Sequence, residues 1–401
     1  MLTRAGERDN QAPPSVGAVF RAFLRLGLTA FGGPAMVPVI GEMVVERKQW
    51  LSSLAFRDGV ALCQTIPGAT AMQTAAYCGL RARGVPGAAV AYIGFGLPAF
   101  IVITILSAAY RATHSLPVSL ALFRGLQVIV IAIIVRAVVT FTRATVHGWQ
   151  DLLISLAAAA ALLAGISPVA VIAAAAVAGV PLRRHRTGAA DGGGASPDRH
   201  AVRLPLRPLV GIIVGGGAAL VLLRVLAPKL CQLALLMLRI DLLAFGGGFA
   251  SVPLMLHAVV DVKRWLGTRA FMDGIALGQV TPGPIVITAT FVGYQVKGLA
   301  GAVIATAAIF TPSFVVLLAA VPYFDRLQRS VVFRSAMRGV LASFVGLLVS
   351  TAITFVLAAH WSLFLALLAG AAFVALMLKA DLLLVVMAGG AAAALSHYVR
   401  L

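Results

Sequence analysis

The sequence predicts an all-α polytopic membrane protein in which two homologous six-span halves, in inverted orientation, are joined by an extra span. Three observations predict this fold. Charged residues are too few for a soluble protein, apolar stretches of bilayer length recur along the chain, and one pattern of Gly, Pro and aromatic residues occurs twice. Together they predict about 13 transmembrane segments, some of them broken helices.

The composition excludes a soluble globule. The 401 residues are 61% hydrophobic and 11% charged, whereas soluble proteins have about 25% charged residues. The net charge of +19 does not indicate a nucleic-acid partner, because Arg and Lys lie mainly between apolar segments. We interpret these cations as topology signals and as contacts with membrane lipid.

No pattern of an enzyme or metal site is present in the sequence. Cys63, Cys78 and Cys231 have no CxxC spacing, and the seven histidines are not at metal-ligand spacing. No signal-peptide cleavage site follows the polar residues 1–16. We therefore expect no enzyme activity, no metal and no other cofactor.

The repeated pattern organises the chain. Equivalent positions are 214 or 215 residues apart, as with Phe31 and Phe245, and the order is kept from there to Gly125 and Gly339. This regularity predicts two homologous halves. The motifs of the first half are Phe31-Gly32-Gly33-Pro34 and Gln64-Thr65-Ile66-Pro67-Gly68, and their counterparts are Phe245-Gly246-Gly247-Gly248 and Gln279-Val280-Thr281-Pro282-Gly283.

Four regions follow from the repeat. They are a first repeat (1–182), a basic cytoplasmic linker (183–207), an extra transmembrane segment (208–228) and a second repeat (229–401). In the first repeat we expect a polar connection at 41–58 and apolar segments at 17–40, 57–80, 86–110, 121–142, 151–166 and 168–182. In the second we expect segments at 229–257, 271–296, 300–322, 335–359, 361–377 and 381–399.

Loop charge predicts the orientation. The linker contains six Arg and two Asp without apolar periodicity, and basic loops stay on the cytoplasmic side. Counting outward from it places the N-terminus on the cytoplasmic side of the membrane and the C-terminus on the outer side. Because an odd segment separates the repeats, the second half is inverted relative to the first.

The repeated Gly and Pro residues interrupt apolar segments. Such a step breaks the helical hydrogen-bond ladder, and exposed backbone is tolerated in a membrane only inside protein or beside a wet cavity. Four interruptions, paired between inverted halves, predict discontinuous helices that meet near the membrane midplane, as in secondary transporters.

A broken helix frees backbone N–H groups whose partial positive charge favours anions, and Gly lets a ligand approach the backbone closely. We therefore expect an oxyanion site at the interruptions, with neutral donors from Gln and Thr. The predicted binding residues are Gly32, Gly33, Pro34, Gln64, Thr65, Pro67, Gly68, Gly246, Gly247, Gly248, Gln279, Thr281, Pro282 and Gly283. The alternative is that Gly and Pro only mark kinks and close packing.

Charged residues within the spans extend this prediction. Arg25 and Arg239 occupy equivalent positions and could bind a dianion, or extend to the lipid headgroups instead. Asp241 has no counterpart and could neutralise Arg239 or carry a proton. Asp58 and Asp273 are interpreted as caps at helix starts.

These motifs resemble the chromate ion transporter family in its two-domain form. The matching stretches are LRLGLTAFGGPAMVPVI, ERKQWLSSLAFRDGVALCQTIPGATAMQTAAYCG, LAFGGGFASVPLM and ALGQVTPGPIVITATFVGY. The resemblance implies efflux of chromate across the bacterial inner membrane and chromate resistance. Pro34 stands where the second half has Gly248, so the halves are expected to differ at the site.

Other functions remain open on sequence alone. The same breaks could build a transporter or channel for another oxyanion such as sulfate, or a membrane scaffold without transport. Inverted repeats favour a transporter, because rocking one half against the other exchanges access. The coupling ion and the oligomeric state, including a homo-oligomer, are not determined by the sequence.

Overall fold

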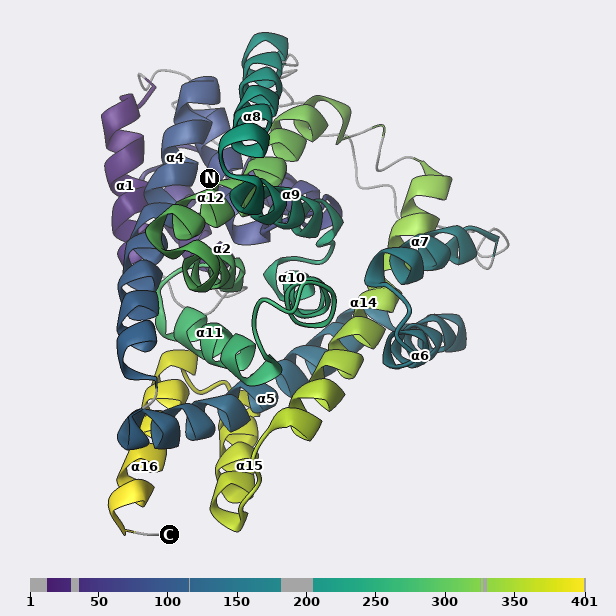
Figure 1. Ribbon diagram of the computed structural model, residues 1–401. Helices are drawn as coiled ribbons and strands as arrows, with labels where there is room; N and C mark the ends of the chain where they lie inside the picture. Colours follow the sequence, from purple (N-terminus) through teal and green to yellow (C-terminus); the bar gives the residue numbers. More distant parts are fainter. Residues whose placement is uncertain are drawn as a thin grey trace, which may run out of the picture.

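A computed structural model describes residues 13–29, 36–114, 116–181, 205–324, 326 and 330–399. These residues form helices and turns, and they include no strand, which confirms an all-α protein (Figure 1). The linker predicted at 183–207 lies almost entirely outside the described residues, since only 205–207 are included.

The helices follow the predicted order, with several short 3-10 and π turns at their ends. The first half contains α1 (Val16–Thr29), α2 (Met36–Gly41), η3 (Glu42–Arg47), α3 (Ser53–Thr65), α4 (Thr70–Thr113), α5 (Pro117–Thr145), α6 (Trp149–Leu163) and α7 (Pro168–Gly179). The extra segment is α8 (Leu206–Leu226). The second half contains α9 (Pro228–Leu243), η5 (Gly248–Ala250), α10 (Ser251–Leu256), η6 (His257–Val262), α11 (Thr268–Val280), η7 (Ile285–Ile287), α12 (Thr288–Ala320), η8 (Val321–Tyr323), α14 (Val331–Ala358), α15 (Leu363–Met377) and α16 (Leu382–Val399).

Five helical runs in the described residues are long and apolar enough to cross a bilayer. They are α4, α5, α8, α14 and the run Ile285–Tyr323 that contains α12. The helices α6, α7 and α15 have 15, 12 and 15 residues, which at 1.5 Å per residue is shorter than a hydrocarbon core of about 30 Å. The count of 13 spans and the inversion of the halves therefore stay predictions.

The segments expected at 57–80 and 271–296 do not cross as single broken helices, so that prediction is wrong. If 57–80 ran straight on, Gly59 and Tyr77 would be about 27 Å apart, yet a Cβ on Gly59 would overlap the Tyr77 ring. The chain therefore folds back at residues 66–69 (tip 1), and α3 with residues 70–82 forms a helical hairpin (hairpin 1).

The second half repeats this geometry. A Cβ on Gly274 would overlap the Phe291 ring, and one on Gly278 would lie 3.0 Å from Thr288 Oγ1. The chain folds back at residues 281–284 (tip 2), so α11 and residues 288–296 form hairpin 2. Each 13-residue arm of α3 and α11 is about 20 Å long and reaches only part of the way through a bilayer.

Both α4 and α12 turn sharply after their hairpin arm. Arg83 and Gly84 leave the helical conformation in α4, and Lys297 and Gly298 do so in α12. Gly84 has a φ of 67°, which favours glycine. Each helix therefore consists of a short hairpin arm and a long second arm, residues 85–113 in α4 and 299–320 in α12.

Cap chemistry sets several helix boundaries, and it corrects one predicted connection. Ser52 begins α3 by accepting the Ala55 N–H at 3.2 Å. The polar connection predicted at 41–58 is mostly helical, because η3 continues to Arg47 and α3 begins at Ser53.

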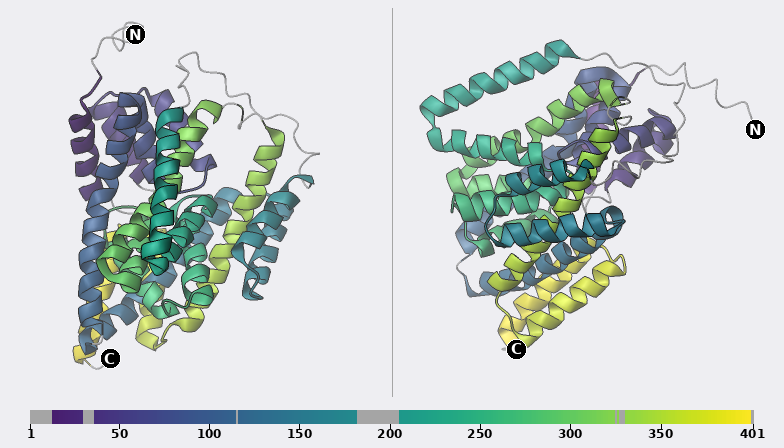
Figure 2. Two further views of the ribbon diagram at one scale, coloured as in Figure 1. Left: turned by 45° about the horizontal axis from the view of Figure 1, so that its top comes forward. Right: turned by 90° about the vertical axis from the view of Figure 1, so that its right-hand side faces the viewer.

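The helices form two bundles that each contain parts of both halves (Figure 2). In the first bundle, α1 packs on the second arm of α4, and α9 packs on the second arm of α12. These two arms pack on each other, and α8 lies on the outside of α9. In the second bundle, α5 and α14 cross; α6 and α7 pack on α14, while α15 and α16 pack on α5. Figure 1 shows α2, α10 and α11 between these bundles.

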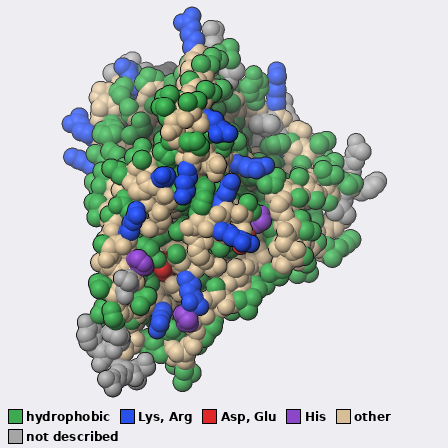
Figure 3. Space-filling view, viewed as in Figure 1, with side chains coloured by type: hydrophobic (Ala, Val, Ile, Leu, Met, Phe, Trp, Pro, Cys, Tyr) green, Lys and Arg blue, Asp and Glu red, His purple; other side chains and the backbone are tan. Residues whose placement is uncertain are grey.

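The surface keeps the basic character of the sequence. Figure 3 shows one face, on which Lys and Arg side chains are spread between hydrophobic ones and acidic side chains are few. Helix α8 is the most exposed long helix, with only 6% of its most apolar stretch buried, as expected for a helix that faces lipid.

Candidate functional site

Three of the four predicted interruptions, one from the first half and two from the second, meet between the two bundles. Tip 1, the segment Gly246–Gly248 and tip 2 lie against one another, and we call them the break cluster. The backbone N–H of Gly68 donates to the carbonyl oxygen of Ala244 at 2.9 Å. A Cβ on Gly247 would lie 3.1 Å from Thr70 Oγ1, and one on Gly248 would lie 2.9 Å from Ile285 Cγ2.

Three helix N-termini converge at the break cluster. Residues 70–82 begin after tip 1, the continuous helix Gly248–Val262 begins at the glycines, and η7 begins after tip 2. Gly246 and Gly247 have φ values of 89° and 95°. This backbone conformation is unfavourable for residues other than glycine. N-terminal helix ends carry partial positive charge, so their convergence favours an anion.

Some backbone donors of the break cluster are occupied and others are free. Tip 1 donates through Gly68 and Ala69, whose N–H binds Ser313 Oγ at 3.1 Å. The N–H groups of Gly247, Gly248 and Gly283 have no acceptor among the residues that the structure describes. These free donors could bind an oxyanion, because an unpaired buried N–H is costly.

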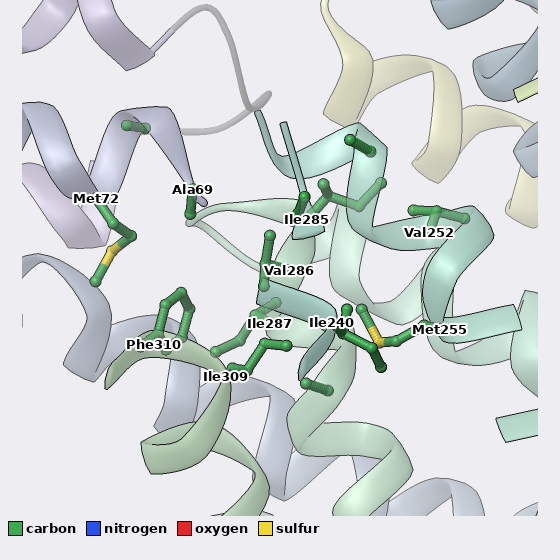
Figure 4. Close-up of a cluster of buried hydrophobic side chains, with 14 of the residues drawn as sticks. Ala69, Met72, Ile240, Val252, Met255, Ile285, Val286, Ile287, Ile309 and Phe310 are labelled. Atoms are coloured by element: carbon green, nitrogen blue, oxygen red, sulfur yellow. The ribbon is translucent and has the colours of Figure 1, made fainter. Parts of the chain in front are cut away.

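Apolar side chains enclose the break cluster. Figure 4 shows Ala69 of tip 1 beside Ile285 and Val286 of η7, with Ile240 of α9 nearby. All four are at most 5% exposed. A site of this kind has a low local dielectric, which strengthens each hydrogen bond to a bound anion.

The predicted Gln and Thr side chains are not equivalent in the two halves. Gln64 is exposed, whereas Gln279 is 6% exposed and its Nε2 has no partner among the described residues. The hydroxyls of Thr65 and Thr281 bind carbonyl groups of their own helices, Ala61 and Leu277, at 2.7 Å. Of these four side chains, Gln279 keeps a free buried donor.

The remaining predicted residues of the interruptions fall into two groups. Pro67 and Pro282 lie in the tips beside Gly68 and Gly283, whose φ values are 117° and 128°. Gly32, Gly33 and Pro34 lie outside the described residues.

Arg25 and Arg239 are both exposed. Arg25 is exposed and lines a cavity of about 660 Å³ between α1, α2 and η3, together with Arg21, Arg47 and Lys48. Glu42 lies in the same cavity and pairs with Arg47 at 2.7 Å. This cavity therefore has a positive balance.

Arg239 is exposed on α9, and its neighbour Asp241 does not pair with it. Instead, the Asp241 carboxylate accepts the N–H of Ser313 at 2.7 Å and the Ser313 hydroxyl at 2.6 Å. Of the two roles left open by the sequence, neutralisation of Arg239 is therefore not the one that this geometry supports. Asp241 is 1% exposed.

Asp58 and Asp273 are not helix caps, so this prediction is also wrong. Each lies well inside its helix, and the N-cap positions of α3 and α11 are Ser52 and Gly267. Asp273 is 6% exposed and accepts Tyr110 Oη–H at 2.9 Å and Gln127 Nε2–H at 2.8 Å. This carboxylate therefore ties hairpin 2 to α4 and α5 of the other half.

Sequence reasoning missed three polar residues that hold tip 1. Gln73 donates to the carbonyl oxygen of Pro67 at 2.7 Å, Ser313 accepts from Ala69, and Thr70 faces Gly247. The available signal was position: Gln73 and Thr70 directly follow the Pro-Gly step, and Ser313 follows the repeated Pro312.

The chain is similar in sequence to known transporters. The family model described as "Chromate transporter" matches residues 17–180 and 231–395. An uncharacterized transporter of Methanocaldococcus jannaschii is 39% identical over 390 residues, 96% of each chain. Proteins named "Chromate transport protein" are 32% identical in Cupriavidus metallidurans, over 86% of this chain and 83% of that one, and 33% identical in Pseudomonas aeruginosa, over 85% and 81%. No solved structure matches the chain.

Proposed function

The chain belongs to the chromate transporter family, and from this premise we propose that it is a secondary transporter that exports chromate across the bacterial inner membrane. Export would give the cell resistance to chromate. The family and the apolar helices make it a multi-pass membrane protein. Our proposal adds the direction of chromate transport, the location in the inner membrane and the residues that bind chromate.

One observation carries the proposal: three helix N-termini and a run of glycine backbone converge at the break cluster. Chromate is a compact dianion with four oxygens, so it needs several donors around a small volume. The free N–H groups of Gly247, Gly248 and Gly283 would supply donors without adding positive side chains. Gln279 Nε2 is a further donor that is buried without a partner.

The expected energy of such a site is sufficient for a transporter. A hydrogen bond to a charged group contributes about 1.5–3 kcal/mol. Three or four such bonds contribute about 4.5–12 kcal/mol before the cost of association, and millimolar to micromolar affinity corresponds to about 4–8 kcal/mol. A transporter benefits from this range, because the ion must also leave the site.

The test is transport in everted membrane vesicles, in which export appears as uptake. We expect labelled chromate to accumulate, with the pH gradient and the membrane potential varied separately to identify the driving force. An anion leaving a negative cytoplasm gains about 2.3 kcal/mol per charge per 100 mV. Vesicles that accumulate sulfate but not chromate would assign another oxyanion, and currents far above carrier turnover would indicate a channel.

We also propose that the linker 183–207 and the N-terminus are cytoplasmic and that the C-terminus is periplasmic. The support is the basic balance of the linker in the sequence. A cysteine placed at Ala195, in a variant without the three native cysteines, should not react with an impermeant thiol reagent in whole cells. Reaction there, without reaction of a cysteine added at the C-terminus, would reverse the orientation.

Arg25 and Arg239 offer a matched pair of substitutions for the anion path. We expect Arg25→Gln to weaken chromate binding about tenfold, the effect of roughly 1.4 kcal/mol, because Arg25 lines a cavity with other cations. Arg239→Gln should have a smaller effect, since Arg239 is exposed on α9. Isothermal titration with chromate at low and high salt measures both. If both variants bind as the parent does, the arginines only contact headgroups.

A further inference from the structure

Tip 1 is tied to a buried carboxylate through a single residue. The Asp241 carboxylate accepts the N–H of Ser313 at 2.7 Å, and the Ser313 hydroxyl lies 2.8 and 2.6 Å from its two oxygens. Ser313 Oγ in turn accepts the N–H of Ala69 at 3.1 Å. The carboxylate is therefore two hydrogen bonds from the backbone of the break cluster, and it lies on the helix whose Ala244 binds Gly68.

No cation compensates this carboxylate within the described residues. The ion pairs there do not include Asp241, and α10 carries no charged residue. Beside Ser313, Tyr92 of α4 donates to the Phe310 carbonyl at 2.8 Å. The other titratable groups of α8, α9 and α12 are the buried Cys231 and the intermediate Tyr294, with exposed Arg207, Arg224, Lys229, Arg239 and Lys297.

The hydrogen-bonded contact from tip to serine to carboxylate exists in only one half. The positions equivalent to Asp241 and Ser313 in the first repeat are Gly27 and Ala99. A Cβ on Gly283 would lie 2.6 Å from Ala99 Cβ, so tip 2 meets a methyl group where tip 1 meets a hydroxyl. Tip 1 is therefore held by a polar contact, and tip 2 by packing.

We propose that Asp241 is a proton-binding site that controls the release of tip 1, so that chromate binding and protonation of Asp241 favour each other. The first part concerns the hairpin alone; the coupling to chromate rests on the proposed function. An ionised carboxylate binds the Ser313 donors through charge-assisted bonds, which are about twice as strong as neutral ones. Protonation weakens these bonds and loosens the Ser313–Ala69 contact.

Charge gives the sign of the coupling. An ionised Asp241 repels an anion at the break cluster, so a bound dianion favours the protonated carboxyl. Linkage is reciprocal, so the proton favours the anion by the same factor. The proton comes from water and returns to water after release. A chromate dianion that crosses with this proton carries one net negative charge.

The first arm of the test needs no chromate. Hydrogen exchange of the peptide containing Gly68 and Ala69 is followed by mass spectrometry in detergent as the pH is lowered, with rates corrected for intrinsic exchange. Protection in the parent protein should fall about tenfold, which corresponds to roughly 1.4 kcal/mol. Asp241→Asn should show low protection at every pH, and so should Ser313→Ala. Asp273→Asn, the matched buried carboxylate, should leave the behaviour of tip 1 unchanged.

The second arm counts protons taken up when chromate is added in weak buffer. The parent and Ser313→Ala should take up more protons per bound chromate than Asp241→Asn; the titration of chromate itself is common to all and cancels. Equal proton uptake in Asp241→Asn, or pH-dependent protection of tip 1 in that variant, would overturn the inference. If the parent binds no chromate, the proposed function fails, while the exchange arm still decides whether Asp241 controls tip 1.

Discussion

Replacing Gly68 with alanine should reduce chromate transport about tenfold or more while the protein still reaches the membrane. The new Cβ would overlap Ser313 Oγ, and Ser313 is fixed by its bonds to Asp241. A φ of 117° adds backbone strain of about 1–2 kcal/mol. Tip 1 must therefore shift, which changes the geometry of the backbone donors. Initial rates in everted vesicles, normalised to folded transporter, measure the effect.

Gly84→Ala is the matched control, since Gly84 also has a positive φ of 67° but has no atom within 4 Å of the added Cβ. Its transport should stay within about twofold of the parent, because the strain of about 1–2 kcal/mol is not transmitted to a tip. Gly283→Ala should resemble Gly68→Ala, since its Cβ would lie 2.6 Å from Ala99 Cβ. Parental transport by both tip variants would mean that the tips only pack.

Asp273→Ala should destabilise the folded protein by about 2–6 kcal/mol, because two buried donors lose their acceptor at about 1–3 kcal/mol each. The substitution leaves Gln127 Nε2, in a side chain that is 5% exposed, without an acceptor, and it unties hairpin 2 from α5. We expect a large fall in the melting temperature of the protein in detergent. Size-exclusion chromatography of heated samples measures this fall.

A second substitution distinguishes the loss of these hydrogen bonds from a simple loss of side-chain volume at position 273. Adding Gln127→Leu should restore part of the stability, because an apolar partner has no unsatisfied donor. Leucine already occupies the equivalent position in the second half, Leu341. Tyr110→Phe alone should cost about 1 kcal/mol. If Asp273→Ala melts like the parent, the buried network contributes little and the hairpin is held by packing.

The sequence predicted the helical class, the order of the segments and the positions of the interruptions, because these depend on local composition. It did not predict that 57–80 folds back, since a mainly apolar stretch of 24 residues with a central Pro-Gly has the length of a single span. The difference lies in tertiary contacts such as Gly59 against Tyr77, which no local pattern encodes.

The same limit applies to the candidate site. The glycines were found because they occur in a repeat, and the structure brings Gly68, Gly247 and Gly248 into one cluster. Gln64 and Gln279 occupy equivalent positions in the repeat but differ in burial, which no local pattern encodes. The bond between Ser313 and Asp241 joins residues 72 positions apart, and sequence spacing gives no signal for such a pair.

The mixed bundles have a consequence for how the protein is made. Because α5 packs on α15 and α16, and α6 and α7 pack on α14, the helices translated first must wait in the membrane for partners that the ribosome has not yet synthesised. Neither half can complete its own packing. A gene divided between α7 and α8 would therefore encode two polypeptides that assemble as an obligate pair, and mispaired copies of one half would be targets for membrane proteases.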